Sequence, residues 1–262
     1  MDDFTPYGGD FEEDLSNLGK VLHKCIEINL PLSPEKCEFL MTEGTVLGHS
    51  ISQQGLQVDP NKITIIQRVP PLQKQRDIRS FLGLVGYYRR FIKDLSKLAS
   101  PLFGLLAKDS KFVWSKSCQE ALDTLKDKLT TAPILRGPNW ALPFHIHVDA
   151  SHKAIGVALG QVEEKFPYAI YFISENLSKD ELNYTVTKKE HLAIVHSLNK
   201  FRHHITGYQT FVHTDHAAIK YLMKKLDVNA RIIGWLLLLQ QFDLTIVDKP
   251  GKEMLLQTFY LG

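Results

Sequence analysis

The spacing of hydrophobic positions divides the chain into two halves. In the first half, apolar residues recur every three or four positions, which is the period of an amphipathic helix. Such helices are predicted over residues 10–30 and 61–67, from Lys74 along an apolar stripe that runs from Ile78 to Leu95, and over 115–130. Residues 37–52 interrupt this pattern and predict a short β-hairpin that turns near Glu43 and Gly44.

The second half begins after Gly137-Pro138-Asn139-Trp140, which breaks the helical pattern and is our preferred domain boundary. Strands are expected at 143–151, 154–162, 168–174, 209–215 and 243–248, with helices at 187–201, 217–224 and 229–241. Strands followed by alternating helices and strands are typical of an α+β or α/β domain. We therefore expect a mixed five-stranded sheet with helices on its faces.

One predicted strand carries the most informative residue of the chain. The run from Phe144 to Val148 is predicted to be a buried strand that ends in Asp149, and a tight turn leads from it to a second apolar strand. A buried carboxylate costs free energy unless it is paired or binds a metal. We therefore expect other residues of the chain to pair with Asp149 or to bind a metal together with it.

Two other acidic residues occupy suitable positions. Glu190 shares the apolar face of its predicted helix with Ala193 and Ile194, and Asp215 ends a later strand. Three such carboxylates repel one another unless divalent cations neutralise them, and oxygen-only ligands favour Mg²⁺ or Mn²⁺. Two such ions can activate water and stabilise the leaving oxygen in phosphodiester hydrolysis.

Each of these acids also has a simpler interpretation. Asp215 precedes His216 where a helix is predicted to begin, so it can serve as a helix N-cap. Glu190 can pair with a nearby Lys or Arg, and Asp149 can belong to a turn with Ser151. The ordered set of three is more specific than any one of its members.

A histidine cluster offers a second metal hypothesis. His145 and His147 share a strand face with Asp149, and His213 is expected on the adjacent strand. This arrangement suggests zinc. Histidines on a sheet face are more often packed or hydrogen-bonded, so we favour the carboxylate site.

Composition limits the class of protein. The chain has 262 residues and is 44% hydrophobic, which is enough for one large or two ordinary domains. Its net charge of +2 neither requires nor excludes a nucleic-acid partner. Three cysteines without CxxC spacing favour a reducing compartment. No signal peptide and no membrane-spanning run is visible, so an intracellular location is expected.

Three segments of the second half carry a family resemblance. VDAS…GVALGQ, SENLSKDELNYTVTKKEHLAIVHSLNKFRHHITGYQTFVHTDHAAIKYL and GWLLLLQQFDLTIVDKPGKE resemble the ribonuclease H (RNase H) domain of LTR retrotransposon Pol polyproteins of the Ty3/Gypsy (Metaviridae) type. Upstream, LSPEKCEFLMTEGTVLGHSIS resembles the hairpin after a reverse-transcriptase palm, and IRSFLGLVGYYRRFIKDLSKLASPLFGLL resembles the thumb and connection. The match is collinear over nearly the whole chain.

The resemblance implies an organisation and a partner. It implies a palm remnant over residues 1–55, a mostly helical thumb/connection over 56–136 and an RNase H-like domain over 137–262 with a degenerate last helix. It also implies RNA-directed DNA synthesis and hydrolysis of RNA in RNA–DNA hybrids, beside other Pol segments of the parent polyprotein. The implied location is the cytoplasm, in virus-like particles, or the nucleus.

The resemblance also implies roles for individual residues. Asp149, Glu190 and Asp215 would be catalytic ligands of Mg²⁺ or Mn²⁺ in RNase H. Asp2 and Asp3 resemble the tail of the palm's Tyr/Phe-x-Asp-Asp motif and would be polymerase metal ligands, or else are solvated terminal acids.

A basic, aromatic cluster lies in the thumb-like region. Tyr88, Arg89, Arg90 and Lys93 would contact nucleic acid there, with Arg89, Arg90 and Lys93 on the backbone. Without the resemblance, the same pattern is that of an ordinary amphipathic helix.

The chain departs from the family in ways that affect activity. No upstream palm aspartate or fingers segment is present, so we expect no polymerase activity from this chain alone. Thr258 occupies the position of a fourth carboxylate, and Gly234 stands where relatives often carry Arg. A neutral hydroxyl cannot replace an anionic ligand, so RNase H activity is expected to fall by roughly two or more orders of magnitude. The alternative hypothesis is a non-catalytic nucleic-acid-binding remnant of a degenerate retroelement.

Overall fold

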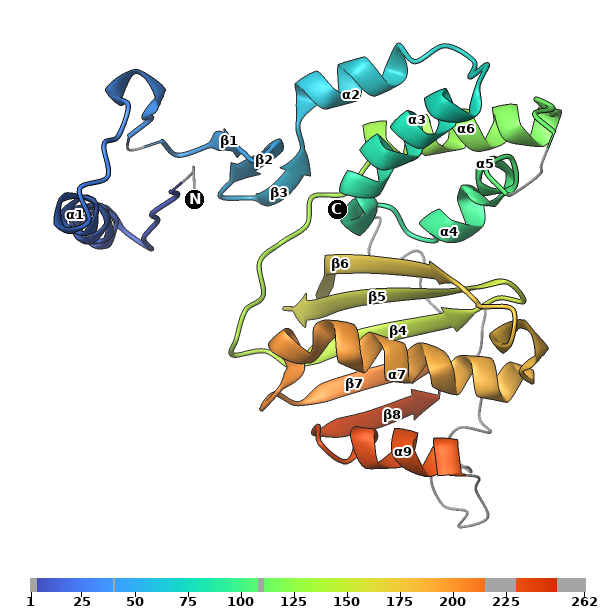
Figure 1. Ribbon diagram of the computed structural model, residues 1–262. Coiled ribbons are helices and arrows are strands. Elements are labelled where there is room, and N and C mark those ends of the chain that lie inside the picture. Colours follow the sequence, from blue (N-terminus) through green and yellow to red (C-terminus); the bar gives the residue numbers. More distant parts are fainter. Residues whose placement is uncertain (1–3, 40, 108–110, 215–229, 249–262) are drawn as a thin grey trace.

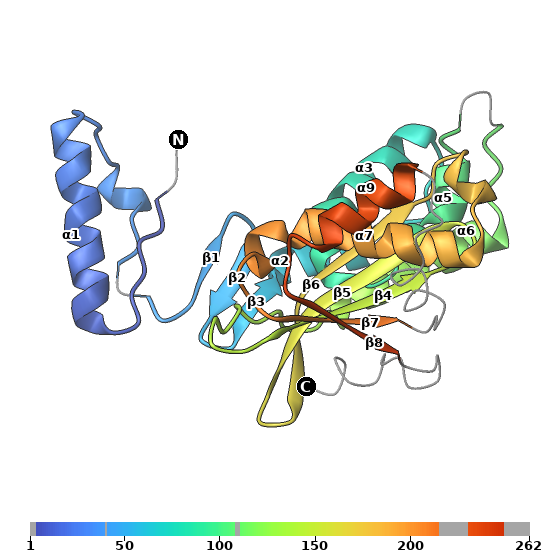
Figure 2. The same ribbon diagram turned by 90° about the horizontal axis from the view of Figure 1, so that it is seen from below.

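The computed structural model describes residues 4–39, 41–107, 111–214 and 230–248 (Figure 1). Its first helix, α1 (Phe11–Glu27), confirms the helix predicted at 10–30. The helix begins at Asp10, whose side chain accepts a 2.8 Å hydrogen bond from the Glu13 amide. Helix α1 stands apart from the larger body in both ribbon views, and a short 3₁₀ turn, η1 (Pro34–Lys36), follows it (Figures 1 and 2).

A small antiparallel sheet comes next. Its strands are β1 (Gly44–Val46), β2 (His49–Ser52) and β3 (Gly55–Val58). The predicted turn near Glu43 and Gly44 was wrong, because Gly44 pairs with Ile51 inside the sheet. The chain instead reverses at Leu47 and Gly48, whose φ angles of 47° and 68° suit the two-residue turns of tight hairpins.

A group of helices follows the small sheet. Its elements are α2 (Pro60–Gln67), α3 (Gln75–Tyr87), the 3₁₀ turn η2 (Arg89–Phe91), α4 (Leu95–Leu98), α5 (Ser100–Gly104) and α6 (Lys116–Thr130). The predictions at 61–67 and 115–130 are confirmed. The apolar stripe from Ile78 to Leu95 is not one helix, because α3 ends at Tyr87. The break allows Phe91 and Ile92 to be buried, and Asp94 then adopts a left-handed φ of 55°.

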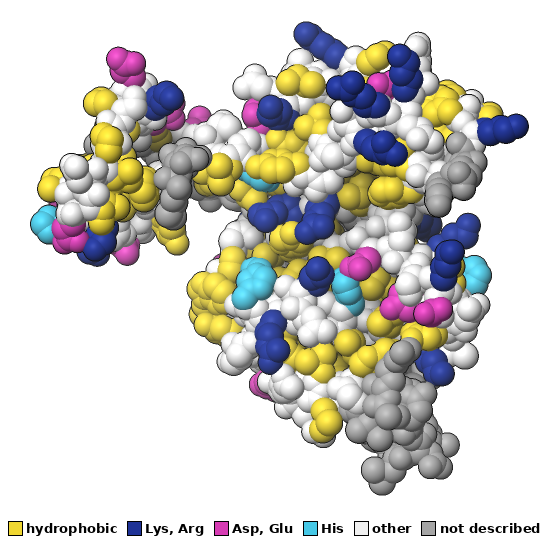
Figure 3. Space-filling model, in the orientation of Figure 1, with side chains coloured by type: hydrophobic (Ala, Val, Ile, Leu, Met, Phe, Trp, Pro, Cys, Tyr) yellow, Lys and Arg dark blue, Asp and Glu magenta, His cyan; other side chains and the backbone are white. Residues whose placement is uncertain are grey.

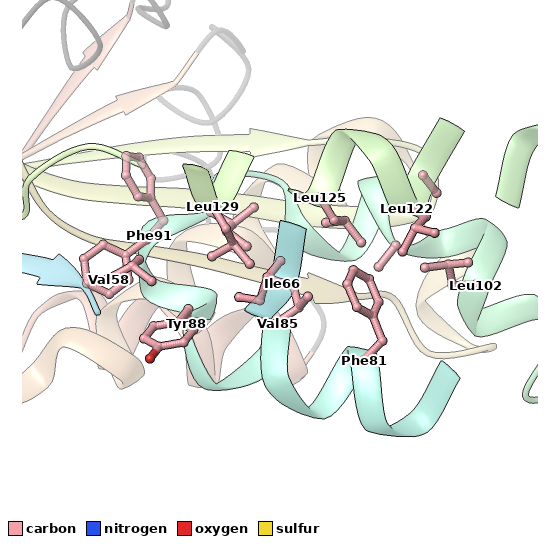
Figure 4. Packing of buried hydrophobic residues seen from close by; sticks show 14 of the residues in the cluster. Val58, Ile66, Phe81, Val85, Tyr88, Phe91, Leu102, Leu122, Leu125 and Leu129 are labelled. Atoms are coloured by element: carbon pink, nitrogen blue, oxygen red, sulfur yellow. The ribbon is translucent and has the colours of Figure 1, made fainter. Parts of the chain in front are cut away.

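The helices enclose one hydrophobic core (Figure 4). Leu122, Leu125 and Leu129 of α6 point toward Ile66 of α2 and Val85 of α3. The same cluster includes residues of the larger sheet, namely Ala158, Ala169 and Phe172. The helical region and one face of that sheet therefore share a continuous apolar interior.

The larger sheet has five strands in the order β6-β5-β4-β7-β8. These are β4 (Phe144–Ala150), β5 (Ala154–Glu163), β6 (Phe166–Asn176), β7 (Thr210–Thr214) and β8 (Leu244–Asp248). Strands β4, β5 and β6 pair antiparallel, whereas β7 is parallel to both β4 and β8. The predicted mixed five-stranded sheet is confirmed.

Helices lie on both sides of this sheet. Helix α7 (Val186–Ile205), preceded by the 3₁₀ turn η3 (Glu181–Asn183), and helix α9 (Ala230–Leu239) pack on one face, as Figure 1 shows for α7. On the opposite face, η2 and α4 pack against β6. The helix predicted at 217–224 lies outside the described residues. Within the described ranges, no helix is long and apolar enough to span a membrane.

Candidate nuclease-type carboxylate site

Two parallel strands bring the predicted site residues to one edge of the sheet. Strands β4 and β7 run side by side in the same direction, with His147 of β4 opposite His213 of β7. Their carboxyl ends are therefore neighbours. Asp149 lies at the end of β4, and Thr214 is the last residue of β7.

The Glu190 side chain joins these two strand ends. Helix α7 is N-capped by Thr185 and carries Glu190 on the side that packs on the sheet, where only 2% of the residue is exposed. Glu190 Oε1 accepts a 3.2 Å hydrogen bond from the Ala150 amide. Glu190 Oε2 accepts a 3.3 Å bond from the Thr214 hydroxyl. The buried carboxylate is thus fixed between the residue that follows Asp149 and the residue that precedes position 215.

Asp149 differs from the expectation in one respect. Its side chain is exposed rather than buried. Side chains alternate across a strand, so Asp149 projects from the face opposite to Val148, which is fully buried under α7. Burial therefore does not require Asp149 to be paired, and its role as a metal ligand stays a prediction.

The remaining predicted metal ligands lie outside the described residues: Asp215, Asp2 and Asp3, together with position Thr258. Among the residues that are described, no group of three or more His, Cys, Asp or Glu is arranged to hold a metal ion. Asp149 and Glu190 supply hard oxygen donors of the kind that Mg²⁺ and Mn²⁺ prefer.

The histidine cluster is assembled on the same sheet as predicted. His145 Nδ1 lies 2.8 Å from His213 Nε2, and the His147 ring stacks on His213 with 4.3 Å between centroids. The rings contact one another and Phe211. These contacts are those of packed, hydrogen-bonded side chains, and the described residues give the zinc hypothesis no support.

The four predicted nucleic-acid contacts have different environments. Tyr88 is fully buried, and its hydroxyl donates a 2.6 Å hydrogen bond to the Gly48 carbonyl, so this residue serves the fold. Arg89 is exposed. The Arg90 guanidinium lies over the Tyr171 ring, 4.9 Å from its centroid. The basic members of the group are therefore the ones that reach the surface.

The fourth of these residues, Lys93, lies near the carboxylate site. Burial lowers the pKa of the Lys93 ammonium, whereas the Asp94 and Asp149 carboxylates raise it. Burial raises the pKa of the neighbouring Asp94 carboxyl; Lys93 lowers it, and Asp149 raises it further. Both groups are thus within electrostatic reach of Asp149.

Lys189 was not among the predicted site residues. It is 4% exposed, and its Nζ donates a 3.0 Å hydrogen bond to the His152 carbonyl and lies 3.2 Å from His152 Nδ1. His152 belongs to the turn that follows β4. Lys189 therefore ties α7 to the loop beside Asp149. Lys189 lies among several polar residues, so the sequence gives no signal that distinguishes it. The burial of Lys189 depends on the position of the loop that contains His152.

Comparison with known proteins finds similarity in the second half of the chain to one family model and over nearly the whole chain to several relatives. Residues 139–242 match the model of the RNase H-like domain found in reverse transcriptase. The chain is 32% identical to the retrovirus-related Pol polyprotein from transposon opus and 35% identical to that from transposon 297, both of Drosophila melanogaster. Each alignment covers 97% of this chain, and 26% and 24% of the relative.

Further similarity extends to a fungal relative and to solved structures. The chain is 32% identical to the transposon Tf2-3 polyprotein of Schizosaccharomyces pombe, over 96% of this chain and 19% of that protein. It therefore spans about a quarter or less of these curated relatives. The foamy viral protease-reverse transcriptase in complex with RNA/DNA hybrid has a TM-score of 0.76 at 22% identity, over 94% of this chain and 34% of that chain. A second foamy viral structure, with double-stranded DNA, has a TM-score of 0.77 at 23% identity, over 93% of this chain and 44% of that one. These structures support the fold.

Proposed function

We propose that this chain hydrolyses the RNA strand of RNA–DNA hybrids as part of a retrotransposon Pol polyprotein, because residues 139–242 match the RNase H-like domain found in reverse transcriptase. In this proposal residues 1–55 are a palm remnant, residues 56–136 form the thumb and connection, and residues 137–262 form the nuclease domain. RNA-directed DNA synthesis is proposed for the parent polyprotein, of which this chain is a part.

One observation carries the proposal. The buried Glu190 carboxylate accepts hydrogen bonds from the Ala150 amide and the Thr214 hydroxyl, at the adjacent ends of two parallel strands. These contacts join Glu190 to the residue that follows Asp149 and to the residue that precedes position 215 in the sequence, which supports a shared catalytic site.

The three proposed ligands are Asp149, Glu190 and Asp215, with Mg²⁺ or Mn²⁺ as the metal. When bound, such ions generate a nucleophilic water and stabilise the leaving oxygen of a phosphodiester. In the chain itself, the hydrogen bonds from Ala150 and Thr214 fix the orientation of Glu190. Groups that orient a ligand in this way are important for metal affinity.

A basic surface supports nucleic acid as the substrate. Lys and Arg side chains gather along the junction between the helical region and the large sheet, as Figure 3 shows. Arg89 and Arg90 belong to η2, which packs against β6 at this junction. The related foamy viral enzyme was solved with an RNA/DNA hybrid, which supports the same class of partner here.

The sequence supports a slow enzyme. Thr258 stands where the family places a fourth carboxylate, and loss of one anionic ligand is expected to lower the rate by roughly two orders of magnitude. The second candidate function, hybrid binding without cleavage, rests on this same substitution.

Cleavage of a labelled RNA–DNA hybrid in Mg²⁺ or Mn²⁺ tests the proposal. We expect slow cleavage by the chain, its loss in Asp149→Asn and Glu190→Gln, and an increase of about tenfold or more in Thr258→Asp. Glu120→Gln is the matched control, because Glu120 is exposed on α6 and pairs with Lys116. Binding of the hybrid without cleavage, in both the wild type and Thr258→Asp, would instead support the non-catalytic function.

A further inference from the structure

A short segment of the helical region crosses the large sheet at the carboxylate site. Asp149 of β4, Gly156 of β5 and Ser174 of β6 are aligned in register, so they form one row across three strands. These three positions lie on the face of the sheet opposite to α7. Residues 93–96, which lead from the connection after η2 into the first turn of α4, lie against this row at Gly156 and Ser174.

Two contacts fix the segment on the row. The Ser96 amide donates a 3.0 Å hydrogen bond to the Ser174 hydroxyl. The Asp94 carboxylate lies so close to the Gly156 backbone that a Cβ at position 156 would collide with it. Asp94 also accepts hydrogen bonds from the Lys97 and Leu98 amides through its own carbonyl, which anchors the start of α4. The segment is therefore held by its backbone as well as by its side chains.

The placement of this segment also fixes the position of Lys93, the residue before Asp94. Lys93 is half-buried, it precedes the Asp94 that lies against Gly156 of this row, and the Asp94 and then the Asp149 carboxylate raise the pKa of its ammonium against the effect of burial. We propose that Lys93 is a substrate-positioning residue of the nuclease centre, which holds a backbone phosphate of the hybrid beside Asp149. This inference rests on the proposed function, and it places Lys93 at the nuclease site rather than on a polymerase-bound duplex.

Charge complementarity explains why a cation is needed at this position. Carboxylates such as Asp149 and Glu190 repel the phosphate that must approach them. A lysine is a compact charge with three donors, and a half-buried one is less screened by salt than an exposed one. Contacts with phosphate fix the register of a nucleic acid without reading its sequence. Lys93 would thus help to place the scissile bond at the carboxylates.

The test uses the full chain with Lys93→Gln and compares KM and kcat for hybrid cleavage. We expect KM to rise about tenfold with kcat changed less than threefold, because a lost phosphate contact weakens substrate binding. The slope of log Kd against log salt should decrease by about one, as for a single lost phosphate contact. Lys93→Arg should restore much of the affinity. Lys116→Gln is the charge-matched control, because Lys116 is 91% exposed on α6.

Hybrid binding in Ca²⁺ separates this inference from the proposed function. If the wild type binds the hybrid in Ca²⁺ but does not cleave it in Mg²⁺ or Mn²⁺, the proposed activity fails. Weaker binding by Lys93→Gln, but not by Lys116→Gln, would in that case still show that Lys93 holds a backbone phosphate. Unchanged KM and binding in Lys93→Gln would overturn the inference while cleavage by the wild type preserves the proposed function. Thermal unfolding checks folding. Lys93→Met, which keeps the aliphatic stem, replaces Lys93→Gln if the latter unfolds.

Discussion

The Tyr88 hydroxyl donates a 2.6 Å hydrogen bond to the carbonyl of Gly48, which ties the start of η2 to the turn between β1 and β2. Tyr88 is fully buried. Removing the hydroxyl in Tyr88→Phe should lower the free energy of unfolding by about 1 kcal/mol, because the Gly48 carbonyl loses its partner. Urea unfolding measures this change. Tyr7→Phe, at a ring that is 81% exposed, should leave stability unaltered.

Because Tyr88 is buried, we expect the stability of the fold to depend on alkaline pH. Burial raises the pKa of the Tyr88 phenol to about 12, with a further contribution from Asp59. The unfolded chain releases this proton near pH 10, whereas the folded chain retains it, so the contribution to stability is present below pH 10 and lost as the pH rises through about 12. Stability measured from pH 9 to 12 should therefore fall less in Tyr88→Phe than in the wild type. Equal slopes would contradict this account.

Gly156 predicts a steric effect at the junction of the two regions. In Gly156→Ala, the new Cβ must displace the Asp94 carboxylate, and we expect a loss of about 1–2 kcal/mol in stability. Gly83→Ala is the matched control. A Cβ at this position in α3 meets nothing within 4 Å, so alanine should be neutral or stabilise the helix by about 0.5–1 kcal/mol. Urea unfolding of both variants tests the contrast, and equal effects would exclude the proposed collision.

Thr214 predicts an effect on catalysis that exceeds its effect on stability. Thr214→Val removes the hydroxyl that donates to Glu190 Oε2 and keeps the shape of the side chain. Loss of a group that orients a metal ligand typically costs about tenfold or more in activity, so kcat should fall by about that factor. Thr210→Val removes another buried hydroxyl from the same strand and controls for stability. An equal kcat in the two variants would show that the Thr214 hydroxyl does not orient Glu190.

We expect the partly buried His204 ring to make the fold less stable at acidic pH. Its ring packs against Trp140 and Phe144, and burial, followed by the charges of His203 and Arg90, lowers its pKa to about 4. The unfolded chain binds a proton near pH 6.5 that the folded chain does not, so this contribution is present above pH 6.5 and lost as the pH falls through about 4. Because the ring is only partly buried, solvent screening limits the effect to about 1 kcal/mol. Melting temperatures from pH 7 to 4 should decline less steeply in His204→Asn, and a parallel decline would contradict the prediction.

Local periodicity was enough to predict the regular elements. Strands β4 to β8 and helices α2, α6 and α7 lie close to their predicted bounds, because each presents one apolar face over several turns or alternations. The position of Glu190 on the inner face of α7 follows from the same reasoning. The turns and the ends of short segments were harder to predict from the sequence. The turn at Leu47 and Gly48 and the end of α3 at Tyr87 depend on positive φ angles and on contacts with distant residues.

The sequence by itself determined the sheet, its covering helix and the resemblance of residues 139–242 to the RNase H-like domain found in reverse transcriptase, because these properties depend on periodicity and on motifs within single elements. Only the tertiary structure decided which groups surround those elements. In the folded chain Asp149 is exposed and Tyr88 is buried. Residues 93–96 lie against the row of sheet positions that contains Asp149 and Gly156. The reason is physical: the burial of Tyr88 and the placement of residues 93–96 depend on the packing of segments that are forty or more residues apart in the chain, and no local pattern records that packing.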